Sequence, residues 1–216
     1  MKPIFLELFA GKGTLSLSAR RVGFESVTVD IDPSTKPDIC IDILNLRRSI
    51  LPNKVAVAWA SPPCTQWSLL QSHYHFSSLE IGYRTYYHEP RTPQAIKSLL
   101  ILKATARIIC SLNPHYYFIE NPRAILRHRP EMCFVPYRKT VRYSDFGFPY
   151  EKPTDIFTNC KHFQPHTSRR PKGLALLTSE PDLLVRQSIP PQLADYIAHV
   201  SAAHLPSGYT LTPALF

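Results

Sequence analysis

One cysteine of the chain stands where its side chain could act as a nucleophile. Residues 60–68, Ala-Ser-Pro-Pro-Cys-Thr-Gln-Trp-Ser, follow an apolar run, residues 55–59, that is typical of a buried strand. Two prolines end that strand and fix the backbone directly before Cys64. In open α/β sheets the carboxyl ends of the strands border the ligand-binding crevice. Cys64 is therefore a candidate nucleophile, and a small buried apolar residue is the alternative interpretation.

A second group of polar residues follows another predicted strand. Residues 116–119, Tyr-Tyr-Phe-Ile, predict a strand that ends in Glu120, Asn121 and Pro122. An acid beside a proline turn thus lies at the carboxyl edge of the sheet, as Cys64 does. We expect the two side chains to border one site.

The N-terminal residues predict the opening unit of a nucleotide-binding α/β domain. Residues 4–21 predict an apolar strand, a glycine turn and a helix. Gly11 and Gly13 allow the backbone to turn tightly and to approach a ligand closely. The full dinucleotide pattern G-x-G-x-x-G is absent because Ser16 occupies its last position, so a purely structural turn remains an alternative.

Two acids follow the next two predicted strands. Residues 27–29 predict a β-branched strand that ends at Asp30, and residues 39–43 predict a strand that carries Asp42. Rossmann-like folds use an acid at the end of the second strand to hold ribose hydroxyls. Exposed turn residues are the alternative interpretation of both acids.

The remaining pattern predicts an α/β fold with a mostly parallel, seven-stranded sheet and helices on both faces. Further strands are expected at residues 139–143 and 154–158, and further helices at residues 95–112 and 192–200. Residues 71–94 are rich in tyrosine and histidine, and we expect them to form a long, partly packed surface loop. No repeat or linker divides the chain, so residues 1–216 are expected to form a single domain.

The composition favours an intracellular protein with a polyanionic partner. The chain has 25 Lys and Arg against 16 Asp and Glu, a formal net charge of +9, so nucleic acid is the leading candidate partner. The five cysteines are odd in number and scattered, which favours a reducing compartment over a disulfide framework. No apolar segment is long enough to cross a bilayer, and no signal peptide pattern precedes the first strand, so we expect no membrane partner.

Zinc-type side chains occur towards the C-terminal part of the sequence. Cys133, Cys160, His162 and His166 have the right chemistry, but no paired C-x-x-C supports them. The sequence therefore predicts no metal site.

The order of these motifs resembles that of the DNA cytosine carbon-5 methyltransferases. Five motifs carry the resemblance, in the family's linear order: residues 7–13 (Glu-Leu-Phe-Ala-Gly-Lys-Gly), the acids Asp30 and Asp42, Pro63-Cys64, Glu120-Asn121, and residues 187–191 (Gln-Ser-Ile-Pro-Pro). The match covers most of the chain, and five motifs in sequence are far more specific than any one of them.

The resemblance implies a Rossmann-like, S-adenosylmethionine-dependent methyltransferase fold with the cofactor bound over the first three strands. Phe9 would stack on the adenine, Asp30 would hold the ribose, and Asp42 would face the adenine amino group. The implied cofactor-binding set is completed by Gly11, Gly13 and Ser188.

The resemblance also implies covalent catalysis on cytosine. The Cys64 thiolate would add to carbon-6, because carbon-5 is a poor nucleophile until that addition. Glu120 would assist by acid–base chemistry at the ring nitrogen, and a target base in a duplex would be flipped out of the stack. The implied substrate-binding residues are Pro63, Asn121 and Ser68, with Arg169 and Arg170 on the DNA phosphates.

Three departures from the family pattern matter. Pro122 stands where the family usually has valine, and residues 150–154, Tyr-Glu-Lys-Pro-Thr, replace its Gln-x-Arg-x-Arg motif. Lys152 would supply a catalytic positive charge without the planar fork of arginine, a variant that resembles phage and viral members. Only a short basic loop, residues 161–186, occupies the interval of the family's target-recognition domain. We therefore expect low or short-site specificity, or a specificity partner protein, in the cytoplasm or nucleus of a host.

Three other functions remain open at this point. The acceptor could be cytosine in RNA, or a free or single-stranded nucleotide, because the recognition domain is missing. Ser61-Pro62-Pro63 resembles the motif of exocyclic amino methylases, although those enzymes place an aromatic residue where Cys64 stands. A catalytically weak nucleic-acid-binding subunit is the third.

Overall fold

A seven-stranded sheet forms the centre of the computed structural model, which describes residues 1–68, 71–82, 85–166, 168 and 188–212. In spatial order the strands are β3 (Ile39–Cys40), β2 (Glu25–Asp30), β1 (Ile4–Leu8), β4 (Val57–Ala60), β7 (Tyr116–Pro122), β9 (Pro153–Thr158) and β8 (Tyr137–Arg142). The first five strands are parallel, and β9 runs antiparallel to both of its neighbours. The predicted α/β fold with a mostly parallel sheet is confirmed.

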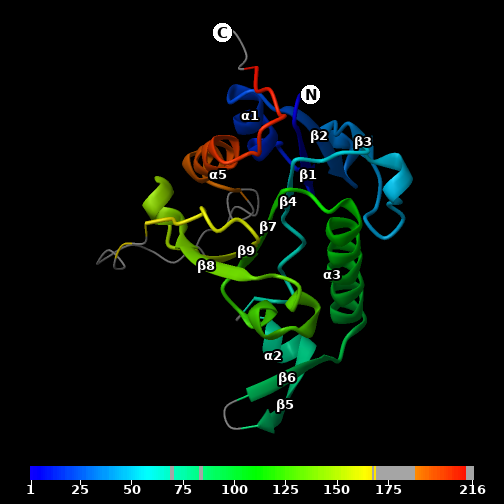
Figure 1. Ribbon diagram of the computed structural model, residues 1–216. Coiled ribbons are helices and arrows are strands. Elements are labelled where there is room, and N and C mark those ends of the chain that lie inside the picture. The colour runs from blue at the N-terminus through cyan, green and yellow to red at the C-terminus, as the bar shows by residue number, and fades with distance from the viewer. Residues whose placement is uncertain (69–70, 83–84, 167, 169–187, 213–216) are drawn as a thin grey trace.

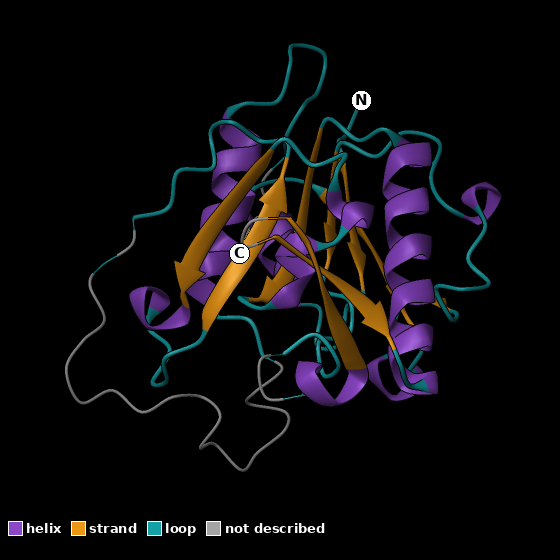
Figure 2. Cartoon of the chain, turned by 90° about the horizontal axis from the view of Figure 1, so that it is seen from below, coloured by secondary structure: helices purple, strands orange, loops and turns teal. Residues whose placement is uncertain are grey.

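Helices cover both faces of the sheet, as the sequence predicts. Helices α1 (Thr14–Arg21) and α5 (Pro191–Ala203) pack together on one face, and α3 (Pro93–Leu112) lies along the other (Figures 1 and 2). Short 3-10 helices complete the connections: η1 (Pro33–Thr35), η2 (Arg48–Ile50), η3 (Ile125–His128), η4 (Pro130–Met132) and η5 (Tyr143–Phe146). None of the described helices is long and apolar enough to span a membrane.

Alternation along the strands builds one apolar core on each face. Successive side chains of a strand point to opposite faces. Phe5, Trp59 and Phe118 are fully buried against α1 and α5, whereas their neighbours Leu6 and Ile119 are buried on the side of α3. Each large side chain buried in this way stabilises the fold by about 1.5–3 kcal/mol.

Local signals fix the ends of α3. Thr92 accepts a hydrogen bond from the Ala95 N–H at 3.2 Å, and Pro93 occupies the first turn, where its missing N–H costs nothing. Asn113 ends the helix with a left-handed φ of 45°, and Pro114 follows. These signals determine where α3 begins after β6 and where it ends before β7.

The prediction of an irregular loop over residues 71–94 is wrong. That segment forms a one-turn helix, α2 (Ser72–His75), and an antiparallel hairpin of β5 (Phe76–Gly82) and β6 (Thr85–Pro90), which extends from the domain in Figure 1. Its base is tied down by backbone and side-chain contacts: the Arg91 N–H donates to the His75 carbonyl at 2.8 Å, and Arg129 donates to the His88 carbonyl. The hairpin pairs residues that are up to 14 positions apart, such as Phe76 with Pro90. Because the segment is polar, no alternation of apolar residues in the sequence indicates this pairing.

The topology brings many chain segments to one edge of the sheet. The parallel strands β1, β2, β4 and β7 all end at that edge. Strand β8 runs in the direction of β7 and ends there too, and the antiparallel β9 begins there. Residues far apart in the sequence thus meet at the carboxyl edge.

Candidate active site

Glu120 lies at the centre of a buried polar cluster at the carboxyl edge. It belongs to β7, opposite Ile156 of β9, and only 5% of its surface is exposed. Its Oε1 accepts a hydrogen bond from the Tyr143 hydroxyl at 2.9 Å and lies 3.6 Å from the Lys152 Nζ. The Lys152 Nζ also lies 4.5 Å from the centre of the Tyr143 ring, a cation–π contact.

The connection between β8 and β9 positions both of these partners. Tyr143 begins the connection and Lys152 ends it, and the Tyr143 N–H donates to the Lys152 carbonyl at 3.3 Å. Glu151, which is 2% exposed, pairs with Arg142 and accepts from the Ser144 hydroxyl at 2.9 Å. Because its charge is paired and hydrogen-bonded, Glu151 can be buried, and it holds the two ends of the connection together.

Tyr143 remains a proton donor in this environment. It is completely buried, and burial first, then the charge of Glu120 and the hydrogen bond to it, raise the pKa of Tyr143 well above its ordinary value. The nearby Thr154 side chain acts on this pKa in the opposite direction, while the charge of Cys64 adds to the rise. Cys64, Glu120 and Tyr143 therefore lie within electrostatic reach of one another.

The turn after β4 presents Cys64 to this cluster. Asn121 is completely buried, and its side-chain amide donates to the Pro62 carbonyl at 3.2 Å, which ties the turn to β7. The Cys64 carbonyl accepts from the Trp67 and Ser68 N–H groups at 3.0 and 3.1 Å. The proline turn and these bonds fix the backbone on both sides of the cysteine.

The environment distinguishes Cys64 from Cys160. Cys160 is 1% exposed, and burial raises the pKa of its thiol, as expected for an inert packing residue. Cys64 is half-buried at the carboxyl edge, beside an acid, a phenol and a lysine. Cys64 combines partial exposure with neighbours that can do chemistry.

Two acids accept hydrogen bonds from the glycine turn after β1 and from the start of the helix that follows it. Glu7 is buried, and its carboxylate accepts the Leu15 and Ser16 N–H groups at 3.3 and 2.8 Å, where α1 begins. Burial, the largest effect, raises the pKa of Glu7, and these hydrogen bonds oppose the rise. Asp30 at the end of β2 accepts the Gly11 N–H at 2.7 Å.

The backbone of this turn has the conformation of a ligand-binding loop. Phe9, Gly11 and Gly13 have left-handed φ angles of 60°, 49° and 68°, and space lies open above both glycines. The positive φ of Phe9 is unusual for a bulky residue and occurs where the chain turns from β1 towards the loop. Asp42 follows β3, and its carboxylate accepts the Leu44 N–H at 2.9 Å.

These residues fit the groups of S-adenosylmethionine. Part-buried carboxylates at Asp30 and Asp42 suit hydroxyl and amino donors, and the half-buried Phe9 ring suits the face of a base. Ser188 lies three residues before the start of α5, is partly exposed and makes contacts of its own. The structure thus brings most of the predicted cofactor set to the edge that carries Cys64.

The predicted substrate-binding residues divide into two groups. Pro63 is exposed on the turn before the nucleophile, and Ser68 ends it, with its hydroxyl donating to the Thr65 carbonyl at 3.1 Å. Arg169 and Arg170, with most of the basic loop at residues 161–186, lie outside the described residues. Within the described part of the chain, no three metal-ligating side chains come together, and the His162 ring stacks instead on that of His204 at 3.8 Å.

Sequence reasoning missed Tyr143 entirely. Its only signal is alternation with the fully buried Val141, which places the ring on the face of Glu120. The registers of β8 with β9 and of β9 with β7 then bring it to the acid.

The sheet order and the polar edge define an α/β methyltransferase fold, and solved structures bear this out. One is the Entamoeba histolytica methyltransferase EhMeth, with a TM-score of 0.53, 15% sequence identity, and 79% of this chain and 58% of that chain covered. Another, encoded within an E. coli prophage and assigned as a DNA modification methyltransferase, has a TM-score of 0.51, 19% identity, and 73% and 46% coverage. The chain spans about half the length of these solved structures.

Sequence comparison identifies the family. Residues 4–169 match the family described as C-5 cytosine-specific DNA methylase. A protein of Frog virus 3 (isolate Goorha), described as a probable DNA (cytosine-5)-methyltransferase, is 31% identical over 170 residues, which are 75% of this chain and 73% of the relative. The chain belongs to the C-5 cytosine-specific DNA methylase family, and its enzyme class is DNA (cytosine-5-)-methyltransferase.

Proposed function

We propose that the protein transfers a methyl group from S-adenosylmethionine to carbon-5 of cytosine in DNA, through a covalent adduct with Cys64. The observation that carries the proposal is the meeting of Cys64, Glu120 and Lys152 at one sheet edge, next to the glycine turn and Asp30. Family membership supports the reaction class.

The side chains account for the activation of the base. The thiolate sulfur of Cys64 forms a bond to carbon-6, and Glu120 protonates or hydrogen-bonds the ring nitrogen that receives the electron density. Lys152 supplies positive charge beside Glu120. After methylation a base takes the carbon-5 proton, and the electron pair of that C–H bond restores the ring double bond and expels the Cys64 thiolate, so the enzyme is regenerated.

The cofactor half of the site has a separate task. S-adenosylmethionine, when bound, supplies an electrophilic methyl group. Phe9 would pack on its adenine, Asp30 and Asp42 would accept hydrogen bonds from ribose hydroxyls and the adenine amino group, and Ser188 would complete the site. The left-handed conformations of Gly11 and Gly13 support this assignment, since they allow close approach of the backbone.

Charge makes the largest contribution to DNA binding, and the protein recognises at most a short DNA sequence. The net charge of +9 favours phosphate contacts, which we assign to the loop at residues 161–186 with Arg169 and Arg170. A loop this short is too small for a recognition domain, so the target site is short or is selected by a partner protein. The target cytosine in a duplex is flipped out of the stack to reach Cys64.

Methyl transfer to matched acceptors tests the proposal. The purified protein is incubated with S-adenosylmethionine carrying a labelled methyl group and with duplex DNA, single-stranded DNA, RNA or deoxycytidine monophosphate. We expect label in duplex DNA, recovered as 5-methylcytosine after digestion, and bisulfite sequencing then reports its position and context. Label only in RNA or in the monophosphate would overturn the DNA assignment.

Adduct trapping tests the role of Cys64. In the presence of S-adenosylmethionine, duplex DNA that contains 5-fluorocytosine should form a stable adduct with the wild-type protein, because after methyl transfer the fluorine cannot leave carbon-5 as the proton does. Cys64→Ser should form none, while Cys110→Ser, a change at an exposed cysteine of α3, should react like the wild type. Methylation of an exocyclic amino group would instead survive Cys64→Ser.

A further inference from the structure

We infer that Tyr143 is a positioning residue whose hydroxyl, together with Lys152, holds Oε1 of Glu120 and leaves Oε2 to face the cytosine ring. The inference rests on the proposed function and deepens it, because it assigns separate tasks to the two oxygens of one carboxyl group. Tyr143 itself acts through Glu120.

Both contacts of Glu120 fall on the same oxygen. The Tyr143 hydroxyl lies 2.9 Å from Oε1, and the Lys152 Nζ lies 3.6 Å from Oε1. An ammonium group can only donate, and Tyr143 keeps its proton because burial and the charge of Glu120 raise its pKa well above the ordinary value. Oε1 is therefore an acceptor, and a proton carried by Glu120 resides on Oε2.

Tyr143 also fixes the position of Lys152. The Nζ lies 4.5 Å from the ring centre, and the Tyr143 N–H donates to the Lys152 carbonyl. The lysine side chain is long and flexible. The hydrogen bond fixes its backbone, and the ring contact and the ion pair with Glu120 hold its ammonium group on the side of Oε1. The positive charge then stabilises Glu120 without competing for the oxygen that meets the base.

A hydroxyl side chain stands at position 154, close to Lys152. Thr154 is completely buried and occupies the second arginine position of the family's Gln-x-Arg-x-Arg motif. Its short side chain cannot replace a guanidinium, and its hydroxyl donates to the Lys152 carbonyl at 3.2 Å. Thr154 thus supports the backbone of Lys152, while the Tyr143 hydroxyl supplies the hydrogen bond to Glu120.

The substitution Tyr143→Phe tests the inference, because it removes the hydroxyl and keeps the ring that contacts Lys152. Steady-state methylation of duplex DNA should show kcat about 10- to 100-fold lower, as expected for the loss of a hydrogen bond to a charged group. The KM values for DNA and for S-adenosylmethionine should remain within about twofold of the wild type, since Tyr143 is completely buried and is inferred to act through Glu120. Thr154→Val should lower kcat less, again at constant KM.

Tyr116→Phe is the matched control. Tyr116 is a buried tyrosine of β7, and its hydroxyl donates to the His204 carbonyl at 2.9 Å, so this variant loses a similar hydrogen bond away from Glu120. Thermal unfolding should shift by a similar amount in both phenylalanine variants, whereas kcat should fall only in Tyr143→Phe. Equal kcat values in the two variants and the wild type would overturn the inference alone, and so would equal losses of kcat in both variants. An inactive wild-type protein would overturn the proposed function instead.

Discussion

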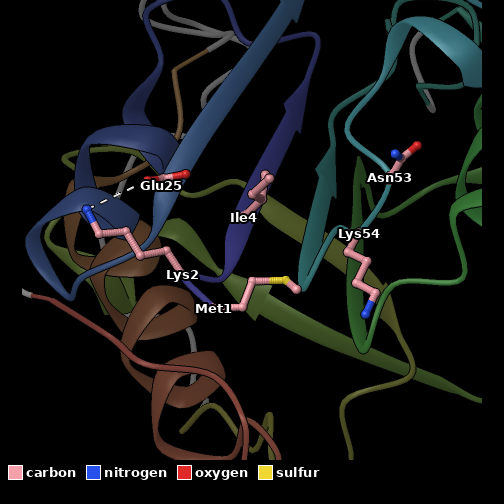
Figure 3. A pocket seen from close by; sticks show the side chains of 6 residues that line it. All are labelled: Met1, Lys2, Ile4, Glu25, Asn53 and Lys54. Atoms are coloured by element: carbon pink, nitrogen blue, oxygen red, sulfur yellow. Dashed lines mark ion pairs between the residues drawn. The ribbon is translucent and has the colours of Figure 1, made fainter.

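The two edges of the central sheet differ sharply although the same strands reach both. At the amino edge, a shallow pocket of about 600 Å³ is lined by Met1, Lys2, Ile4, Glu25, Asn53 and Lys54 (Figure 3). Its ion pair, Lys2 with Glu25 at 3.7 Å, has side chains that are 54% and 57% exposed. At the carboxyl edge, the pair of Lys152 with Glu120 at 3.6 Å has side chains that are 11% and 7% exposed.

The two ion pairs differ in their exposure to water, and this difference determines how strongly each pair interacts. Water screens the amino-edge pair, so its attraction contributes little. The carboxyl-edge pair is shielded from water, where the desolvation of two charges is costly and each interaction is strong. A protein keeps such a costly pair where the charges perform a task, and here they lie beside Cys64.

The largest effect is expected at Cys64. Cys64→Ala should lower kcat for DNA methylation by at least about 10⁴-fold, because removal of a nucleophile removes the covalent route. Thermal unfolding and calorimetric binding of S-adenosylmethionine should change little. Activity within tenfold of the wild type would show that Cys64 is not the nucleophile. The carboxyl edge would then have no assigned nucleophile, and the chemical difference between the two edges would not hold.

The next effect is expected at Glu120 and contrasts directly with the amino edge. Glu120→Gln should lower kcat by about 10²- to 10⁴-fold, the usual contribution of a general acid or base. Glu25→Gln is the matched substitution at the exposed ion pair and should leave kcat and KM unchanged. The methyl-transfer kinetics of the two variants, measured side by side, test this expected difference in kcat. Similar kinetics in both variants would contradict it.

Much of the fold follows from local sequence, and so does the choice of Cys64 as the candidate nucleophile. The strands that end at Asp30, Cys64 and Glu120 are short apolar runs followed by chemistry-bearing residues, which a linear pattern reveals. Tyr143 could not be predicted, because its partner is defined by the pairing of β8 with β9 and of β9 with β7. The hairpin of β5 and β6 was missed for the same reason, since strand register is a non-local property.

Asn121 illustrates a subtler limit of sequence reasoning. The Glu-Asn motif predicts a substrate-binding amide, and the structure shows that amide donating to the Pro62 carbonyl from a fully buried position. A motif identifies which residues belong to a site, but only the packing shows which neighbour each one contacts. The direct role of Asn121 on the substrate therefore stays a prediction.

A smaller effect is expected in the cofactor half of the carboxyl edge. Asp30→Ala removes the acceptor for the Gly11 N–H and the acceptor proposed for the ribose, so the dissociation constant of S-adenosylmethionine should rise about 10- to 100-fold. Asp38→Ala is a suitable control, because Asp38 also accepts a backbone N–H, from Thr28 at 2.8 Å, but is exposed. Titration calorimetry checks both values, and equal affinities would exclude Asp30 from the cofactor site.

The smallest effect is expected at the amino-edge pocket. Lys2→Ala removes one partner of the exposed ion pair, and exposed pairs contribute about 0–1 kcal/mol, so the free energy of unfolding should change by less than about 1 kcal/mol. The kcat and both KM values should equal those of the wild type, because the pocket lies at the opposite ends of the strands that carry the site. Denaturant unfolding and methyl-transfer kinetics test the two statements. A loss of activity without a loss of stability would mean that the amino edge also takes part in the reaction, and the division of tasks between the two edges would then be wrong.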